Sequence, residues 1–136
     1  MAPEPPLLTM SGITKLFPGV RALDGVDLEV QAGEVHCLLG QNGAGKSTLL
    51  ALAAGLLVPT EGTVRVLEAH PGAVRARVGF VDQDKPLYPQ LTVAETLRMG
   101  ADLNPGRWDA DTARRVVAGG DLDPDLRIRA LSGGQR

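Results

Sequence analysis

The spacing of hydrophobic positions along the chain predicts five strands. Residues 7–14 form a first apolar segment, and residues 26–30 and 62–67 carry apolar side chains at every second position. Such alternation is typical of a strand that buries one face. Residues 35–39 and 78–81 are short and mostly apolar without that alternation. The first of these two is expected to be a strand covered on both faces.

Helical spacing predicts three helices between and after these strands. From Lys46, apolar side chains recur at steps of three and four residues and stop near Gly55 and Pro59. Thr92 and Glu95 have the spacing of a capping box, which predicts a helix from residue 92 to about residue 103. A third helix is predicted over residues 108–117, with aspartates in its first turn. Strands and helices that alternate in this way are typical of an α/β domain.

Composition limits the class of protein and its compartment. The chain has 136 residues, of which 43% are hydrophobic and 22% charged, as in a single globular domain. Lys and Arg number 14 against 16 Asp and Glu, so the composition gives no basic surface for nucleic acid. The single cysteine, Cys37, fits a reducing compartment and is expected to be a buried, inert thiol. No apolar run approaches the ~20 residues of a membrane span and residues 1–6 lack a signal core, which indicates a cytoplasmic domain.

Residues 40–48, Gly-Gln-Asn-Gly-Ala-Gly-Lys-Ser-Thr, contain the strongest functional motif of the sequence. They fit the phosphate-binding pattern G-x-x-x-x-G-K-[ST] and lie between a predicted strand and a predicted helix. In such a loop, successive backbone N–H groups and the N-terminal end of the helix face an anion. We therefore predict a nucleotide site in which Lys46 reaches the β- and γ-phosphates and Ser47 binds Mg²⁺. The predicted nucleotide-binding residues of the loop are Gly40, Asn42, Gly43, Ala44, Gly45, Lys46, Ser47 and Thr48.

A second glycine motif limits the class of NTPase to which this loop could belong. Residues 131–135, Leu-Ser-Gly-Gly-Gln, match the LSGGQ signature of ATP-binding-cassette (ABC) ATPases, and the chain resembles that family from about Leu7 to Arg136. Residues 78–83 resemble the strand that leads to the family's Q-loop glutamine, and residues 86–93 resemble the stretch that opens its helical subdomain. Residues 17–26 look like the family's entry segment. The motifs occur in the family's order and spacing.

The resemblance implies an ATP site that two chains share. Family domains bind MgATP, pair head-to-tail with a second ATPase protomer and drive a transmembrane permease subunit, peripherally at the inner face of the cell membrane. Phe17 would stack on adenine, with core packing as the alternative role. Gln83 would contact Mg²⁺ and the attacking water, as a catalytic residue beside Lys46. The residues expected to face the ATP of the other protomer are Ser132, Gly133, Gly134 and Gln135.

The resemblance also implies a P-loop NTPase core of the α/β class, with an antiparallel β subdomain and a small helical subdomain. Within one nucleotide-binding domain over residues 1–136, the core would span about 7–91, the helical subdomain about 92–131 and the signature 131–136. In the family, the Walker B strand and the switch histidine follow the signature. Neither follows it in this sequence, so we expect a portion truncated before Walker B that does not hydrolyse ATP on its own.

Three functions remain open at this point. The leading one is the energising ATPase of a membrane transporter, and the others are a non-transport ABC ATPase and a truncated product that only binds nucleotide. Residues 17–50 are similar to ATPases of sugar-import systems, whereas residues 83–104, with Lys85-Pro86-Leu87-Tyr88, look closer to bacterial drug-export ATPases. The short interval between Gly62 and Gly79 also fits export, which is the favoured direction.

Overall fold

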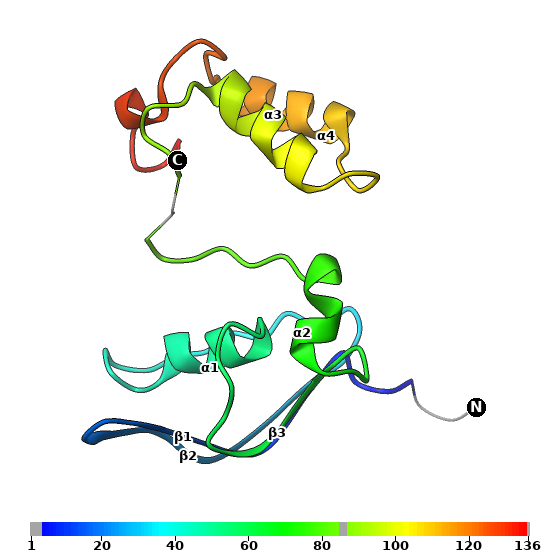
Figure 1. Ribbon diagram of the computed structural model, residues 1–136, viewed down its shortest axis with the longest axis vertical. Helices are drawn as coiled ribbons and strands as arrows, with labels where there is room; N and C mark the ends of the chain where they lie inside the picture. The colour runs from blue at the N-terminus through cyan, green and yellow to red at the C-terminus, as the bar shows by residue number, and fades with distance from the viewer. Residues whose placement is uncertain (1–3, 85–86, 136) are drawn as a thin grey trace. The chain divides into compact units, whose positions relative to one another are not determined.

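The structure, a computed structural model, describes residues 4–84 and 87–135. Contacts within it divide the chain into two compact units, Met1–Phe80 and Val81–Arg136, whose elements are shown in Figure 1. Lys85 and Pro86 of the export-like segment, and Arg136 at the end of the signature segment, lie outside the described residues. The glycine loop at residues 40–48 therefore belongs to the first unit, and the LSGGQ motif belongs to the second.

The first unit is built on a three-stranded antiparallel sheet in the order β2-β1-β3. The central strand β1 (Leu8–Phe17) pairs with β2 (Val20–Val30) on one side and with β3 (Glu61–Val66) on the other. The strands predicted at 7–14, 26–30 and 62–67 are confirmed, although β2 begins earlier, at Val20. The pairing of β1 with β2 shifts register near Lys15, and such a shift bends and twists the strand locally.

One face of this sheet packs against α1 (Lys46–Ala53), the helix predicted to follow the glycine motif. Met10, Ile13 and Leu52 are at most 1% exposed, and burying a side chain of this size stabilises the fold by about 1.5–3 kcal/mol. The buried hydrophobic residues of this core are Met10, Ile13, Leu23, Leu49, Leu52, Val64, Val66 and Val74. The core therefore fixes α1, and with it the end of the glycine loop, against the sheet.

Gly62 allows β3 to approach β1 closely. Its φ of 87° lies in the region that favours glycine, and a Cβ at this position would lie 2.4 Å from the carbonyl oxygen of Gly12. A side chain here would push the two strands apart. The sheet therefore requires glycine at position 62.

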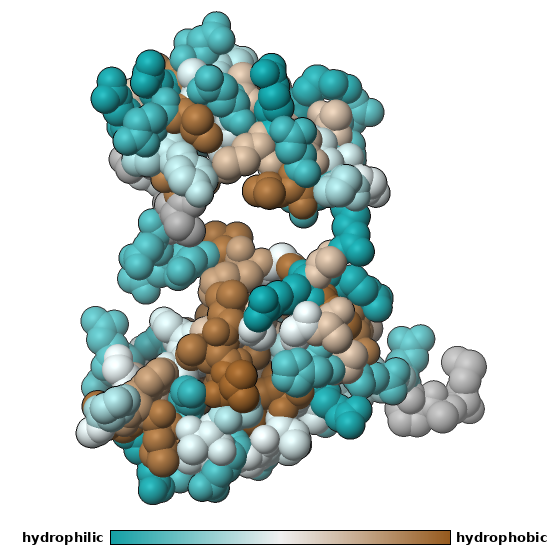
Figure 2. Space-filling model, in the orientation of Figure 1, coloured by the Kyte–Doolittle hydropathy of each residue, from teal (hydrophilic) through white to brown (hydrophobic). Residues whose placement is uncertain are grey.

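The strands predicted at residues 35–39 and 78–81 are wrong. Both segments are irregular, and among the described residues neither pairs with a strand. Val35 and Leu39 are 98% and 88% exposed, and Cys37, predicted to be buried, is exposed. A segment becomes a strand when its backbone forms hydrogen bonds with a neighbouring strand. The hydrogen bonds of this sheet join β1, β2 and β3 to one another. Figure 2 shows hydrophobic residues gathered over the α1 side of the first unit.

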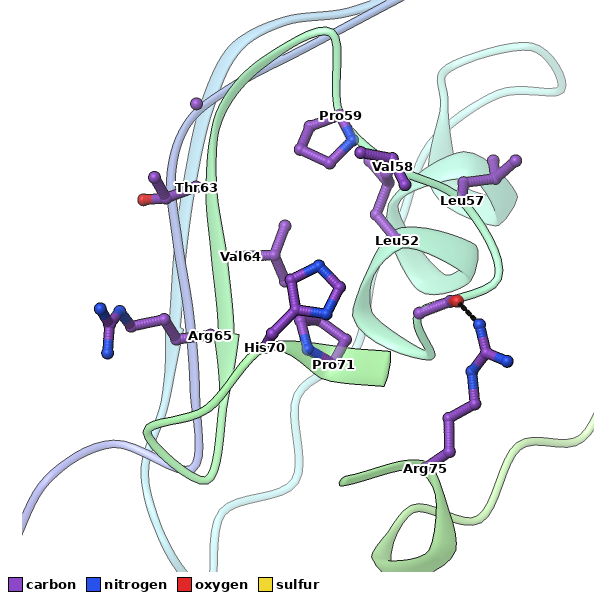
Figure 3. A pocket seen from close by; sticks show the side chains of 12 residues that line it. Leu52, Leu57, Val58, Pro59, Thr63, Val64, Arg65, His70, Pro71 and Arg75 are labelled. Carbon is purple, nitrogen blue, oxygen red and sulfur yellow. Dashed lines mark hydrogen bonds between the residues drawn. The ribbon is translucent and has the colours of Figure 1, made fainter. Parts of the chain in front are cut away.

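Two short helical turns connect β3 to the end of the first unit: α2 (Pro71–Val74) and the 3-10 helix η1 (Arg75–Arg77). His70 caps α2, because its Nδ1 accepts a hydrogen bond from the Gly72 N–H at 3.1 Å. The Arg75 guanidinium donates to the carbonyl oxygen of Gly55, just after α1. A pocket of about 490 Å³ lies beside these contacts (Figure 3). No residue of the glycine motif lines this pocket, so it is distinct from the predicted nucleotide site.

The described part of the second unit contains α3 (Val93–Leu103), α4 (Ala110–Gly119) and the 3-10 helix η2 (Ile128–Ala130). The capping box predicted for α3 is confirmed. The Thr92 hydroxyl accepts from the Glu95 N–H at 3.1 Å, and the Glu95 carboxylate accepts from the Thr92 N–H at 2.8 Å. At the start of α4, Asp109 accepts hydrogen bonds from the Thr112 hydroxyl and N–H, which lower the pKa of this aspartate.

The start of α3 is fastened to the segment that leads to the signature. The Val93 N–H donates to the Leu126 carbonyl at 3.0 Å, and the Ile128 N–H donates to the Leu91 carbonyl at 2.9 Å. Further along α3, the Trp108 ring packs closely enough that a Cβ on Gly100 would lie 2.8 Å from it.

Within the part of the chain that the structure describes, no helix has the length and apolar character needed to cross a membrane.

Candidate nucleotide-binding site

The glycine motif forms a turn that leads directly into α1. The Ala44 N–H closes this turn on the Gln41 carbonyl at 3.1 Å. Gly43 and Gly45 have φ of 85° and 92°, a conformation that side-chain-bearing residues rarely adopt. Among the described residues, no side chain caps α1. The N–H groups of its first turn are therefore available to an anion, as at the N-termini of helices that bind phosphate.

Lys46 is the first residue of α1, and its side chain folds back over the loop. Its Nζ donates to the carbonyl oxygens of Gly40 and Gln41 at 2.6 and 2.8 Å. Both acceptors are neutral and the ammonium has three N–H donors, so one donor and the full charge remain for a phosphate oxygen. A Cβ on Gly40 would lie 3.1 Å from the Cβ of Ala44, which makes the loop tight where the lysine crosses it.

The donor set of the loop fits a triphosphate that carries Mg²⁺. Residues 40–48 contain no carboxylate that would repel phosphate. Ser47, next to Lys46, is exposed, and its hydroxyl is a hard oxygen ligand of the kind that Mg²⁺ prefers. Thr48 follows it, half-buried, in the same helical turn, and Asn42 lies exposed in the loop. The predicted loop residues are thus brought together in one place.

Gly45 holds the loop against the β1–β2 hairpin. A Cβ on Gly45 would lie 2.6 Å from the Ala22 carbonyl oxygen and 2.7 Å from Cδ2 of Leu23. Leu23 is 6% exposed and belongs to the core of the unit. In Figure 1 the loop before α1 and the turn between β1 and β2 lie at the same end of this unit. The hairpin therefore supports the loop by direct contact.

Phe17 lies at the end of β1, on the face of the sheet that carries the loop. Lys15 is paired with Leu23, and residues opposite each other in an antiparallel pair share a face. The Lys15 ammonium lies 5.3 Å from the centre of the Phe17 ring, so both side chains are on the face where Leu23 contacts Gly45. Phe17 is 39% exposed, which leaves part of the residue accessible for stacking. Its contact with adenine stays a prediction.

Glu34 organises the turn that precedes the loop segment. Its carboxylate accepts a hydrogen bond from the Gln31 N–H at 2.7 Å, and its Oε2 lies 2.9 Å from Nε2 of His36. The hydrogen bond from Gln31, followed by that from His36, lowers the pKa of Glu34. Within residues 4–84 and 87–135, no three His, Cys, Asp or Glu side chains gather into a metal site.

The signature residues follow η2 in the second unit. Leu131 is 4% exposed and packs with Val93 and Ile128. The four residues after it are exposed and form a turn, in which the Gln135 N–H donates to the Ser132 carbonyl at 3.1 Å. A second hydrogen bond joins the same two residues, because Oε1 of the Gln135 side chain accepts from the Ser132 N–H at 3.1 Å. Leu131 thus anchors the motif and presents Ser132, Gly133, Gly134 and Gln135 to solvent.

Gln83 also belongs to the second unit, where it lies in a turn. Its backbone N–H donates to the Asp82 carboxylate at 2.7 Å. The predicted contacts of Gln83 with Mg²⁺, and of the signature with a second protomer's ATP, stay predictions.

Sequence reasoning missed three residues around the loop: Lys15, Ala22 and Leu23. Leu23 supports Gly45 by contact, Ala22 does so through a backbone carbonyl, and Lys15 lies over the Phe17 ring. Lys15 and Phe17 lie beyond the strand predicted at residues 7–14, so no sequence pattern placed their side chains on one strand face. The contact of Ala22 is made by its backbone carbonyl, so the pattern of side chains in the sequence does not indicate it.

Comparisons of the sequence with known proteins identify a family. A family model described as ABC transporter matches residues 23–136. The chain is 42% identical over 149 residues to the arabinose import ATP-binding protein AraG 2 of Burkholderia cenocepacia (strain HI2424). It is 41% identical over 145 residues to the ribose import ATP-binding protein RbsA 2 of the same organism. These alignments cover 98% and 96% of this chain, which spans 28% of the length of each relative.

Solved structures of ABC cassettes share the fold. The dimeric bacterial ABC transporter cassette MJ0796 matches with a TM-score of 0.76 and 27% identity, over 94% of this chain and 64% of its own. The ATP-binding subunit of another ABC transporter matches with a TM-score of 0.80 and 27% identity, over 94% and 57%. The predicted α/β class with a P-loop core is thereby confirmed. The phosphate-binding loop, the signature motif and these likenesses agree that the chain belongs to the ABC transporter family.

Proposed function

We propose that this chain provides the ATP-binding part of a transport ATPase and holds MgATP through the loop at residues 40–48. The observation that carries the proposal is Lys46, whose ammonium is folded over the loop at the uncapped start of α1. A triphosphate placed there meets a cation and backbone N–H donors, and no carboxylate of the loop. Ser47 supplies a hydroxyl to Mg²⁺, and phosphate oxygens and water are further ligands.

Replacement of Lys46 tests this proposal. We expect Lys46→Ala to weaken MgATP binding about ten- to a hundredfold, because a hydrogen bond to a charged group contributes roughly 1.5–3 kcal/mol. Calorimetric titration measures the affinity, and thermal unfolding of the same samples verifies the fold. Arg65→Ala is the matched control, because it removes a cation of the first unit whose guanidinium donates to the Glu68 carbonyl, outside residues 40–48. Unchanged MgATP affinity in Lys46→Ala would remove the basis of the proposal.

We further propose that the transporter imports a sugar. The proposal is supported by the 42% and 41% identity to relatives named for arabinose and ribose import, and by the similarity of residues 17–50 to such ATPases. Drug export, the direction favoured by residues 83–104 and by the short interval from Gly62 to Gly79, is the second candidate. ATP-driven uptake of arabinose or ribose by a transporter that contains this cassette would support import, whereas ATP-driven release of substrate would favour export.

The partners of this function are a transmembrane permease subunit and a second ATPase protomer that binds head-to-tail. The exposed signature turn supports the second partner, because it presents a hydroxyl and glycine N–H groups that suit the phosphates of a nucleotide on another chain. A subunit with these partners works in the cytoplasm, peripherally at the inner face of the cell membrane. We propose that residues 1–136 bind MgATP without turnover, since the Walker B carboxylates of the family have no counterpart among them.

A further inference from the structure

Lys15 makes two contacts that connect separate parts of the first unit. Its Nζ lies over the Phe17 ring, 5.3 Å from the ring centre, and donates to the carbonyl oxygen of Val58 at 2.8 Å. Val58 lies between α1 and β3, in the segment that brings the chain back to the sheet. The Lys15 ammonium therefore joins the end of β1 to the segment after α1, the helix that contains Lys46 and Ser47.

The backbone geometry brings this contact to the nucleotide side of the sheet. Lys15 pairs with Leu23, and Leu23 supports Gly45 at the end of the loop. Next to Lys15, the Leu16 N–H donates to the Thr60 hydroxyl at 3.0 Å, and the Thr60 N–H donates to the Thr14 carbonyl at 2.9 Å. The end of β1 is thus held from both sides, and Lys15 is the member of this group that touches the aromatic ring.

We propose that Lys15 is a positioning residue for the base of the nucleotide, acting through Phe17. The inference rests on the proposed function, because it takes Phe17 as the surface on which adenine stacks. A phenyl ring has two faces, and the ammonium over one face leaves the other for a base. The contact with Val58 fixes the ammonium, and the ammonium fixes the orientation of the ring. Lys15 therefore pre-organises the base platform relative to the phosphate loop, which lowers the entropic cost of binding.

The expected effect is confined to ligands that carry a base. Loss of a partly exposed cation–π contact and of the ring orientation that it fixes should weaken ATP binding about three- to tenfold. Inorganic tripolyphosphate with Mg²⁺ has the charges of ATP but no base, so its affinity should stay within about twofold of the original. If Lys15 acted only as a positive charge that attracts phosphate, both ligands would weaken together.

The experiment is a titration of the full chain and its variants with MgATP and with magnesium tripolyphosphate. The variants are Lys15→Met, Lys15→Arg, Phe17→Ala and the double variant Lys15→Met/Phe17→Ala, with Arg65→Met as the matched control for loss of one cation. We expect Lys15→Arg to keep ATP affinity, because a guanidinium also donates hydrogen bonds and stacks on a ring. We expect the double variant to bind ATP no more weakly than Phe17→Ala alone, because Lys15 acts through the ring.

The outcomes separate this inference from the proposed function. If the original chain binds neither ligand, the nucleotide site itself is refuted. If ATP binds and Phe17→Ala leaves its affinity unchanged, the base platform is refuted and the inference falls with it, while the phosphate loop stands. If Phe17→Ala weakens ATP binding but Lys15→Met does not, or if Lys15→Met weakens tripolyphosphate equally, the role of Lys15 is overturned. Thermal unfolding of each variant distinguishes loss of the platform from loss of the fold.

Discussion

Single glycine residues determine whether the loop at residues 40–48 can adopt its conformation. Gly43 and Gly45 both have positive φ, but their surroundings differ. A Cβ on Gly43 would meet nothing within 4 Å, whereas a Cβ on Gly45 would lie 2.6 Å from the Ala22 carbonyl. The first glycine is therefore needed for its backbone conformation alone, and the second is needed for its conformation and for the close approach of β2.

This pair of glycines gives a matched prediction. We expect Gly43→Ala to lower the free energy of unfolding by about 1–2 kcal/mol, the usual penalty of a left-handed conformation with a side chain. We expect Gly45→Ala to cost about 1–3 kcal/mol more, because the loop must also move away from Ala22 and Leu23. Chemical denaturation of both variants measures the difference, and equal destabilisation would contradict the contact between the loop and the hairpin.

The residues of the loop could be predicted from sequence because their chemistry is local. Lys46 and Ser47 follow the glycines directly, and the spacing alone indicates what they bind. Leu23 and Lys15 could not be predicted as parts of the site, since their roles depend on the pairing of β1 with β2 and on the packing of that hairpin against the loop. The order of residues along the chain shows which of them are apolar or charged. Which of them meet at the site depends on contacts between segments that are distant in the sequence.

The helix with a local start signal and the three strands that pair with one another were predicted well, whereas the two segments without a strand neighbour among the described residues were not. The helix α3 was predicted from Thr92 and Glu95 because a capping box satisfies the helix end without any help from the rest of the fold. Residues 35–39 have the composition of a strand, but among the described residues no strand pairs with them. Hydrogen-bonded neighbours, more than composition, determine whether such a segment becomes a strand.

The capping box of α3 supports a prediction at this scale. We expect Thr92→Ala to lower the free energy of unfolding of the second unit by about 1 kcal/mol, because the Glu95 N–H loses its acceptor. Glu95→Gln is the control, since a glutamine side-chain carbonyl can still accept from the Thr92 N–H. Circular dichroism during thermal unfolding reports both variants. A Thr92→Ala variant as stable as the control would mean that the box does not stabilise the helix.

For the whole molecule, the residues predicted to contact ATP are divided between the two units. The phosphate loop and Phe17 belong to Met1–Phe80, and Gln83 and the signature belong to Val81–Arg136. If the signature serves the ATP of a second protomer, a bulky cation at Ser132 should block that contact and spare the loop. The exposure of Ser132 permits the substitution without loss of the buried Leu131 anchor.

We therefore expect Ser132→Arg to bind MgATP within about twofold of the original chain, while losing ATP-dependent association with an intact cassette of the same family. Titration calorimetry measures the binding, and light scattering with added ATP measures the association. Loss of MgATP binding by the variant alone would show that the signature acts on the ATP of its own chain.

The most direct test of the account is a calorimetric titration of the 136-residue chain with MgATP, with phosphate release followed on the same sample. We expect saturable binding of one nucleotide at residues 40–48, and no release of phosphate if the proposal of binding without turnover is right. The Lys46→Ala variant should bind MgATP about ten- to a hundredfold more weakly and should also release no phosphate. Absence of MgATP binding by the original chain, or unchanged MgATP affinity in Lys46→Ala, would contradict the central claim that residues 40–48 form a nucleotide phosphate site.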